Sequence, residues 1–170
     1  MADAAAIAGK PCRIAVNVSA QQFMHDDLVA EVGAILEQTG ADGRMLELEI
    51  TESVILADPG GVVRTIEGLR RLGVEVSIDD FGSGYSNLGY LSRLPVTKLK
   101  IDRAFVRDLL IDRQNEAICD SIISLAHSLS LRVVAEGVEN QAQRDWLVEH
   151  GCDELQGYLF SHPRPFPSDE

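Results

Sequence analysis

Strand-like and helix-like segments alternate along almost the whole chain, and this alternation restricts the folds open to it. The strand-like runs are residues 13–19, 45–51, 74–79, 97–102, 131–136 and 154–159. Between them apolar residues recur at helical spacing, for example at Val62, Ile66 and Leu69. Strands that alternate with helices form a parallel sheet, so we expect an α/β fold.

Polar and apolar residues also alternate within the strand-like runs, which separates two ways of arranging a parallel sheet. In the run 45–51, three apolar residues alternate with Glu47, Glu49 and Thr51. An open, doubly wound sheet is covered by helices on both faces, so its strands should be apolar at every position. A barrel interior that opens into a site at its top accounts for one polar face. We therefore predict a (β/α) barrel of the TIM type.

The length of the chain predicts that this barrel is incomplete. A complete barrel has eight strands in roughly 250 residues, whereas this chain has 170 residues. We expect about six of the eight strands to be present. No linker divides the sequence, so we interpret residues 13–165 as one partial barrel domain, 1–12 as an N-terminal extension and 166–170 as a tail.

The charge balance excludes some classes of partner. The chain has 27 acidic and 15 basic residues, a formal net charge of −12, which repels nucleic-acid polymers and anionic membranes. No apolar run approaches the roughly 18 residues of a membrane span. Cys12, Cys119 and Cys152 show no metal-binding or disulfide spacing, so we expect reduced thiols in a cytoplasmic protein.

Polar side chains stand at the end of every predicted strand, where barrel enzymes place their chemistry. A single residue of this kind is explained by a helix cap or a solvated strand end. Six strand ends in succession are not, because the alternation turns many of these side chains inward. These residues are Asn17, Glu49, Glu52, Asp79, Asp80, Lys100, Asp102, Glu136 and Gln156.

This set predicts a site for divalent cations. Carboxylate and amide oxygens are the ligands that Mg²⁺ or Mn²⁺ prefers. The adjacent Asp79 and Asp80 can serve two ions, which would clamp a phosphate and activate a water molecule. Lys100 would be costly as an unpaired cation in a barrel interior, but beside anionic ligands it can orient or deprotonate that water. The alternative for Lys100 is a structural ion pair with Asp102.

A glycine-rich segment follows Asp80 directly. It lacks the lysine of a phosphate-binding loop, and two aspartates before it would repel a bare phosphate. We interpret it as a flexible loop beside a metal site, able to order around a ligand. Its residues are Phe81, Gly82, Ser83, Gly84 and Tyr85.

Several motifs, in order along the chain, closely resemble the EAL-type cyclic-di-GMP phosphodiesterases. They are Asn17-Val18-Ser19, Glu49-Ile50-Thr51-Glu52-Ser53, Asp79-Asp80-Phe81-Gly82-Ser83-Gly84-Tyr85-Ser86, Lys100-Ile101-Asp102, Ala135-Glu136-Gly137-Val138-Glu139 and Gln156-Gly157-Tyr158. The resemblance implies a bacterial signalling domain that hydrolyses cyclic di-GMP to linear pGpG with two Mg²⁺ or Mn²⁺ ions. It also implies a homodimer.

The resemblance also implies roles for individual residues. Asn17, Glu49 and Asp79 would bind the first ion. Asp79 would bridge to the second, which Asp80 also binds. Lys100 would hold or activate the water.

Further positions of the family pattern complete the site. Glu136 and Gln156 would complete the network of metal and water. Glu52 would anchor the loop after Asp80, which in this family couples the site to the dimer interface. Asp102 and Glu139 are assigned to the same network of substrate and water.

One departure from the family leaves the activity open. The family opens with two further strands and a helix, and the second of these strands carries a Glu-Ala-Leu tripeptide whose glutamate binds the first metal. No such tripeptide occurs in this chain, so we expect an N-terminally truncated domain. The alternative to a phosphodiesterase is an inactive module that binds cyclic di-GMP or a protein. An enolase-like lyase is a third class, because it also uses a lysine base and carboxylate-bound Mg²⁺.

Overall fold

The computed structural model describes residues 13–24, 27–84 and 88–163, and within them six strands form one parallel sheet in the order β1-β2-β3-β4-β5-β6. The strands are β1 (Ile14–Val18), β2 (Leu46–Thr51), β3 (Glu75–Phe81), β4 (Lys98–Ile101), β5 (Arg132–Ala135) and β6 (Glu154–Leu155). Each lies in a predicted run except that β3 continues to Phe81. The last strand ends four residues before the predicted 159, because the chain turns to wrap around Val138: Val138 donates to the carbonyl of Gln156 and accepts from Leu159.

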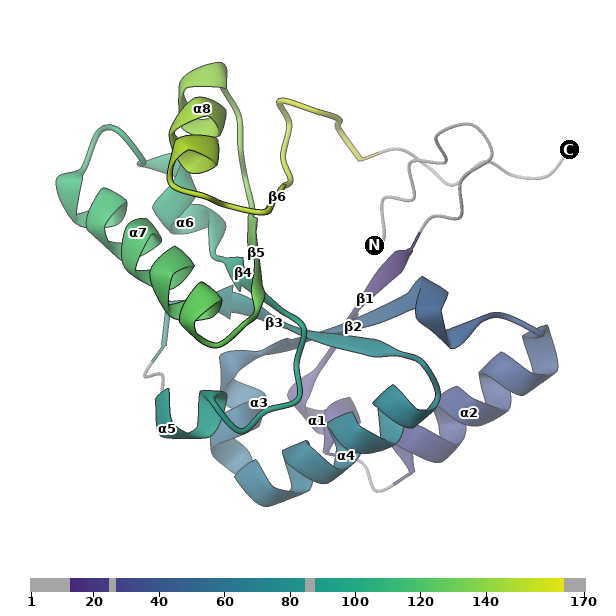
Figure 1. Ribbon diagram of the computed structural model, residues 1–170. Coiled ribbons are helices and arrows are strands. Elements are labelled where there is room, and N and C mark those ends of the chain that lie inside the picture. Colours follow the sequence, from purple (N-terminus) through teal and green to yellow (C-terminus); the bar gives the residue numbers. More distant parts are fainter. Residues whose placement is uncertain (1–12, 25–26, 85–87, 164–170) are drawn as a thin grey trace, which may run out of the picture.

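Helices follow the strands and lie along the outer side of the curled sheet (Figure 1). They are α1 (Ala20–Phe23), α2 (Leu28–Thr39), η1 (Gly43–Met45), α3 (Glu52–Ala57), α4 (Pro59–Arg71), α5 (Leu88–Leu91), α6 (Arg103–Arg107), α7 (Arg113–Ser128) and α8 (Gln141–Glu149). Side-chain caps begin several of them: Asp112 accepts from Gln114 at α7, and Asn140 forms a capping box at α8. No helix among the described residues is long and apolar enough to cross a membrane.

The two faces of the sheet differ as the alternation predicted. Ile50, Ile78 and Leu99 are fully buried and belong to one core cluster with the helices. The other face carries buried polar side chains, among them Glu49 and Lys100. An open sheet covered on both faces would not show this division. The predicted incomplete (β/α) barrel is therefore confirmed.

Candidate functional site

The ammonium group of Lys100 lies at the centre of a buried group of charges at the C-terminal ends of the strands. Its Nζ atom is 2.6 Å from Glu49 Oε1, 2.6 Å from Glu136 Oε1 and 3.1 Å from Asp79 Oδ1. Glu49 lies on β2, Asp79 on β3 and Lys100 on β4, and Glu136 directly follows β5. Because parallel neighbours end at the same edge, four consecutive strands each contribute one group.

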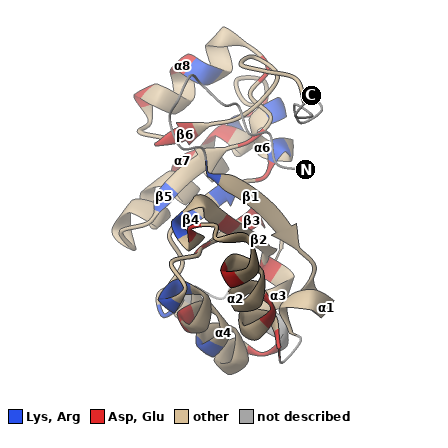
Figure 2. Cartoon of the chain, turned by 90° about the vertical axis from the view of Figure 1, so that its right-hand side faces the viewer, with Lys and Arg blue, Asp and Glu red and all other residues tan. Residues whose placement is uncertain are grey.

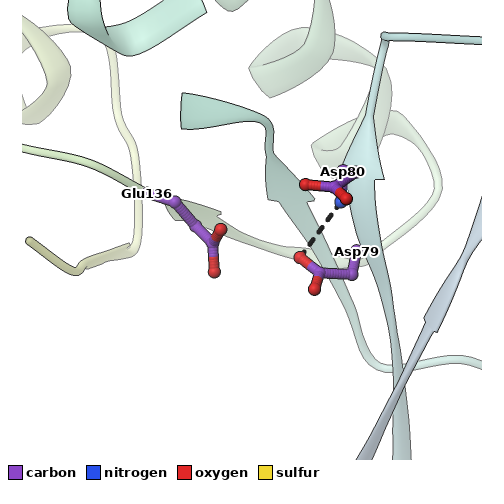
Figure 3. A group of neighbouring side chains, drawn as sticks. All are labelled: Asp79, Asp80 and Glu136. Atoms are coloured by element: carbon purple, nitrogen blue, oxygen red, sulfur yellow. Dashed lines mark hydrogen bonds between the residues drawn. The ribbon is translucent and has the colours of Figure 1, made fainter. Parts of the chain in front are cut away.

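Two consecutive residues, Asp79 and Asp80, turn their carboxylates toward the same side (Figure 3). Neighbouring residues of a regular strand face opposite sides. Asp80 has φ = 52°, a left-handed conformation that aspartate tolerates better than most residues, and the β3–β4 register shifts at this point. Oxygen atoms of Asp79, Asp80 and Glu136 consequently lie within 4.8 Å of one another. We call these three residues the carboxylate cluster.

Burial and mutual repulsion determine the charge of this site. Burial raises the pKa of Glu49 and of Glu136, although Lys100 opposes the rise. Burial and the charge of Asp79 raise the pKa of Asp80. Burial alone would lower the pKa of Lys100, but Glu136 and Glu49 stabilise its charged form, so this pKa is raised. Four carboxylates around one ammonium group leave excess negative charge, which favours the binding of further cations.

The site opens into a cavity of about 590 Å³, and two further predicted residues line it, Asn17 and Gln156. Asn17 is exposed and pairs in register with Glu49 across β1 and β2. Gln156 follows β6, where its backbone N–H donates to the carbonyl of Ala135 at 2.9 Å. The first and last predicted strand ends therefore face the same space as Lys100.

Two predicted residues lie apart from this cavity. Asp102 accepts the backbone N–H of Ala104 at 2.8 Å and so caps α6. The alternative pairing of Lys100 with Asp102 is wrong for the described residues, because the lysine bonds three other carboxylates instead. Glu139 is exposed and is not among the residues that line the cavity.

The glycine-rich segment begins inside the sheet. Phe81 is buried as the last residue of β3. Gly82 then turns the chain with φ = 99°, and the hydroxyl of Ser83 donates to the carbonyl of Asp80 at 2.8 Å. Tyr85 lies outside the described residues. The part of the segment that the structure describes is thus a tight turn directly after the carboxylate cluster.

Glu52, the predicted loop anchor, begins α3 beside this turn. It is 7% exposed, and neither of its carboxylate oxygens has a hydrogen-bond partner among the described residues. A Cβ atom added to Gly84 would lie 3.1 Å from Glu52 Oε2. The glycine therefore lets the backbone of the turn approach a buried carboxylate.

A second layer of charges, which the sequence reasoning missed, lies nearer the N-terminal ends of the strands. Lys98 is buried, and its Nζ atom is 2.9 Å from Glu47 Oε2 and 3.0 Å from Glu154 Oε2. Acidic and basic positions lie on neighbouring strands (Figure 2). The lower ion-pair layer consists of Arg13, Glu47, Glu75, Lys98, Arg132 and Glu154. Its three cations balance its three carboxylates, so the lower layer is neutral, whereas the upper site has an excess of negative charge.

A signal for this lower layer is present in the sequence. Glu47 and Lys98 stand two residues before Glu49 and Lys100. Residues two apart on a strand share a face, so each pair points into the same interior at different heights.

Comparison with known proteins gives matches over nearly the whole chain. The EAL domain family matches residues 1–163. The cyclic di-GMP phosphodiesterase NbdA of Pseudomonas aeruginosa is 46% identical over 158 residues, which cover 93% of this chain and 20% of NbdA. The chain thus spans about a fifth of the length of this curated relative.

Solved structures show the same architecture. The PaMucR phosphodiesterase in complex with c-di-GMP matches with a TM-score of 0.87 and 46% identity, covering 90% of this chain and 62% of that one. Klebsiella pneumoniae BlrP1 in a complex with manganese and cyclic di-GMP matches with a TM-score of 0.79 and 34% identity, covering 89% of this chain and 39% of that one.

Proposed function

This chain belongs to the EAL domain family, and from that premise we propose that it hydrolyses cyclic di-GMP to linear pGpG with divalent cations. The observation that carries the proposal is the meeting of Glu49, Asp79 and Glu136 around Lys100, with Asp80 alongside. The relatives named above as phosphodiesterases support the choice of substrate. Cytoplasmic location and a homodimer belong to the same proposal.

The donor set suits Mg²⁺ or Mn²⁺, and the proposal includes two ions. Three carboxylates lie within 4.8 Å of one another, and hard oxygen ligands suit both metals. Asp79 would bridge the ions, Asp80 and Glu136 would hold one of them, and Glu49 with Asn17 would hold the other. The bound ions would polarise the phosphate and acidify a water molecule. The manganese in the BlrP1 complex supports this assignment.

The residues of the chain would then position the reactants. The ammonium group of Lys100 would donate hydrogen bonds to the attacking water, since its pKa is raised. Gln156, which also lines the cavity, would bind water or substrate. Attack of the water oxygen on phosphorus breaks one P–O3′ bond, the released 3′ oxygen takes up a proton, and the product is linear pGpG. Asp102 and Glu139 lie outside this cavity, and we propose no direct part for them in the step.

A second candidate is a module that binds cyclic di-GMP without hydrolysing it. The observation in its favour is that the chain contains no Glu-Ala-Leu tripeptide. Loss of one metal ligand weakens metal-dependent catalysis when no neighbour substitutes for it. Stoichiometric binding of cyclic di-GMP without turnover would support this candidate over the enzyme.

The deciding experiment is incubation of the purified chain with cyclic di-GMP and Mn²⁺, with pGpG followed by chromatography. We expect product from the wild type and none from Lys100→Met or after chelation of the metal. Arg132→Met is the matched control, because it removes a cation of the lower ion-pair layer that is 47% exposed, and we expect it to retain activity. Folded wild-type protein that binds Mn²⁺ but forms no pGpG would overturn the proposal.

A further inference from the structure

Gln143 is a buried side chain in the first turn of α8 that contacts two other parts of the chain. It is 3% exposed. Its Oε1 atom accepts the backbone N–H groups of Glu139 at 2.8 Å and Asn140 at 3.2 Å. Its Nε2 atom donates to the carbonyl oxygens of Val106 at 3.0 Å and Arg107 at 3.2 Å. Both polar atoms of the amide are therefore engaged twice.

These contacts connect α6 with the loop after β5. The last carbonyl groups of a helix have no partner within the helix, and a buried carbonyl without a partner is destabilising. Gln143 donates to the carbonyl of Arg107, and it is a further donor to that of Val106, which also accepts the N–H of Leu109 at 3.2 Å. Both carbonyls belong to the last turn of α6, a helix that begins two residues after the end of β4, the strand of Lys100. The same side chain holds the loop that begins with Glu136.

Val138 and Glu139 are held by hydrogen bonds, and Gly137 lies too close to α6 for a side chain. Gly137 has φ = 70°, and a Cβ atom there would lie 2.7 Å from the Cβ atom of Arg103 in α6. Val138 is buried and donates its N–H to the carbonyl of Gln156 at 3.0 Å. Glu139 is held by Gln143. The loop therefore restricts Glu136 at its start, whose N–H also donates to the carbonyl of Ile101 at 3.3 Å, and the backbone of Gln156 beside it.

We propose that Gln143 is a positioning residue, which sets Glu136 within the carboxylate cluster by bracing residues 137–139 against α6. Its catalytic consequence rests on the proposed phosphodiesterase function. Its effect on metal binding does not, because Glu136 contributes an oxygen to the cluster whatever the substrate.

The test replaces Gln143 by methionine, which has a similar length and neither hydrogen-bonding amide group. Mn²⁺ binding to the whole chain is measured by calorimetric titration, together with Tm and pGpG formation. We expect Gln143→Met to weaken Mn²⁺ binding about tenfold, the size of effect known for groups that orient metal ligands. We expect kcat to fall while KM for cyclic di-GMP changes little.

The matched control is Asn140→Ala, which removes the side-chain cap of α8, a 3.0 Å contact to the Gln143 N–H, and leaves the four amide contacts in place. We expect it to lower Tm without changing Mn²⁺ affinity. Gln143→Glu keeps the two contacts to the loop, but a carboxylate oxygen then faces the carbonyl oxygens of Val106 and Arg107 and cannot donate to them. It should also weaken Mn²⁺ binding, and it can be compared with Asn140→Ala if the methionine variant does not fold.

Two results would overturn the proposal. One is Mn²⁺ affinity at the wild-type level in a folded Gln143 variant, and the other is an equal loss of affinity in Asn140→Ala. The proposed function fails separately. If the Gln143 variants bind Mn²⁺ more weakly than Asn140→Ala does while the wild type forms no pGpG, the positioning role stands and the phosphodiesterase assignment does not.

Discussion

Asp80 donates its backbone N–H to the carboxylate of Asp79 over 3.0 Å, and the left-handed conformation of Asp80 brings both side chains to one side of the chain. Strand geometry alone would separate them. The pair can therefore face one bound ion together, at the cost of placing two like charges side by side. The pKa of Asp80 is raised by burial and by this neighbour.

Replacing Asp80 by asparagine removes the negative charge but keeps a residue that tolerates the left-handed backbone conformation. Asparagine tolerates the left-handed region, and the change removes repulsion with Asp79, so we expect the free energy of unfolding to stay equal or rise. Mn²⁺ affinity should fall at least about tenfold. Asp80→Ala should lose a similar amount of affinity and also about 1–2 kcal/mol of stability, because alanine is strained there. Calorimetric titration measures the Mn²⁺ affinity, and urea unfolding measures the stability. Wild-type Mn²⁺ affinity in Asp80→Asn would contradict the assignment of Asp80 as a metal ligand.

Glu136 should make the stability of the metal-free protein fall with rising pH. Its folded-state pKa is raised by burial above the ordinary 4.5, so the folded state binds more protons than the unfolded state between these two values. Stability contributed in this way is present below the ordinary pKa and is lost as pH rises through the folded one.

The measurement is the free energy of unfolding of Glu136→Gln minus that of the wild type, in chelator, from about pH 5 to about pH 8. We expect this difference to increase with pH, because glutamine does not titrate. A difference that is constant or decreases would show that the pKa of Glu136 is not raised in the folded chain.

In the lower ion-pair layer, the free energy of unfolding lost when a cation is removed should depend on how deeply that cation is buried. Lys98→Met leaves Glu47 buried without its main partner, and breaking a buried pair in this way costs about 3–5 kcal/mol. Arg132→Met removes the same charge where the side chain is 47% exposed, so its cost should be below about 1 kcal/mol. Urea unfolding of the two variants compares them directly. Equal costs would mean that the pairs of Lys98 contribute no more than surface pairs.

The alternation of polar and apolar residues along the strands made the main features of this fold predictable. Polar residues at every second position of 45–51 and 97–102 required a polar interior, and the strand ends then placed Glu49, Lys100 and Glu136 together. Sequence alone could not assign the partners of Lys100, because Asp102 is only two residues away in the chain while Glu49 and Glu136 come from other strands. In the folded chain Lys100 pairs with Glu49 and Glu136, because the strands bring them together, while Asp102 caps α6.

Other features depended on local backbone geometry that periodicity does not encode. The turn at Asp80 breaks strand alternation, so the shared direction of its carboxylate and that of Asp79 has no signature in the apolar pattern. The residues of the lower ion-pair layer follow the same alternation as those of the upper site, but their charges are balanced and they belong to no catalytic motif. The shortness of β6 follows from the wrapping of residues 156–159 around Val138, which is a tertiary contact.

Replacing the carboxylate of Glu52 should change stability and activity in opposite directions. Both of its oxygens are buried without partners among the described residues, and an uncompensated buried charge is destabilising. Glu52→Gln should therefore raise the free energy of unfolding by about 1 kcal/mol or more. The same carboxylate lies against Gly84 in the turn after the carboxylate cluster, so its loss should loosen the predicted loop and lower pGpG formation.

Ser53→Ala, at an exposed neighbour, should change neither quantity. A glutamine variant that is less stable than the wild type would show that the charge of Glu52 is satisfied in solution, and undiminished turnover would remove its role as the loop anchor.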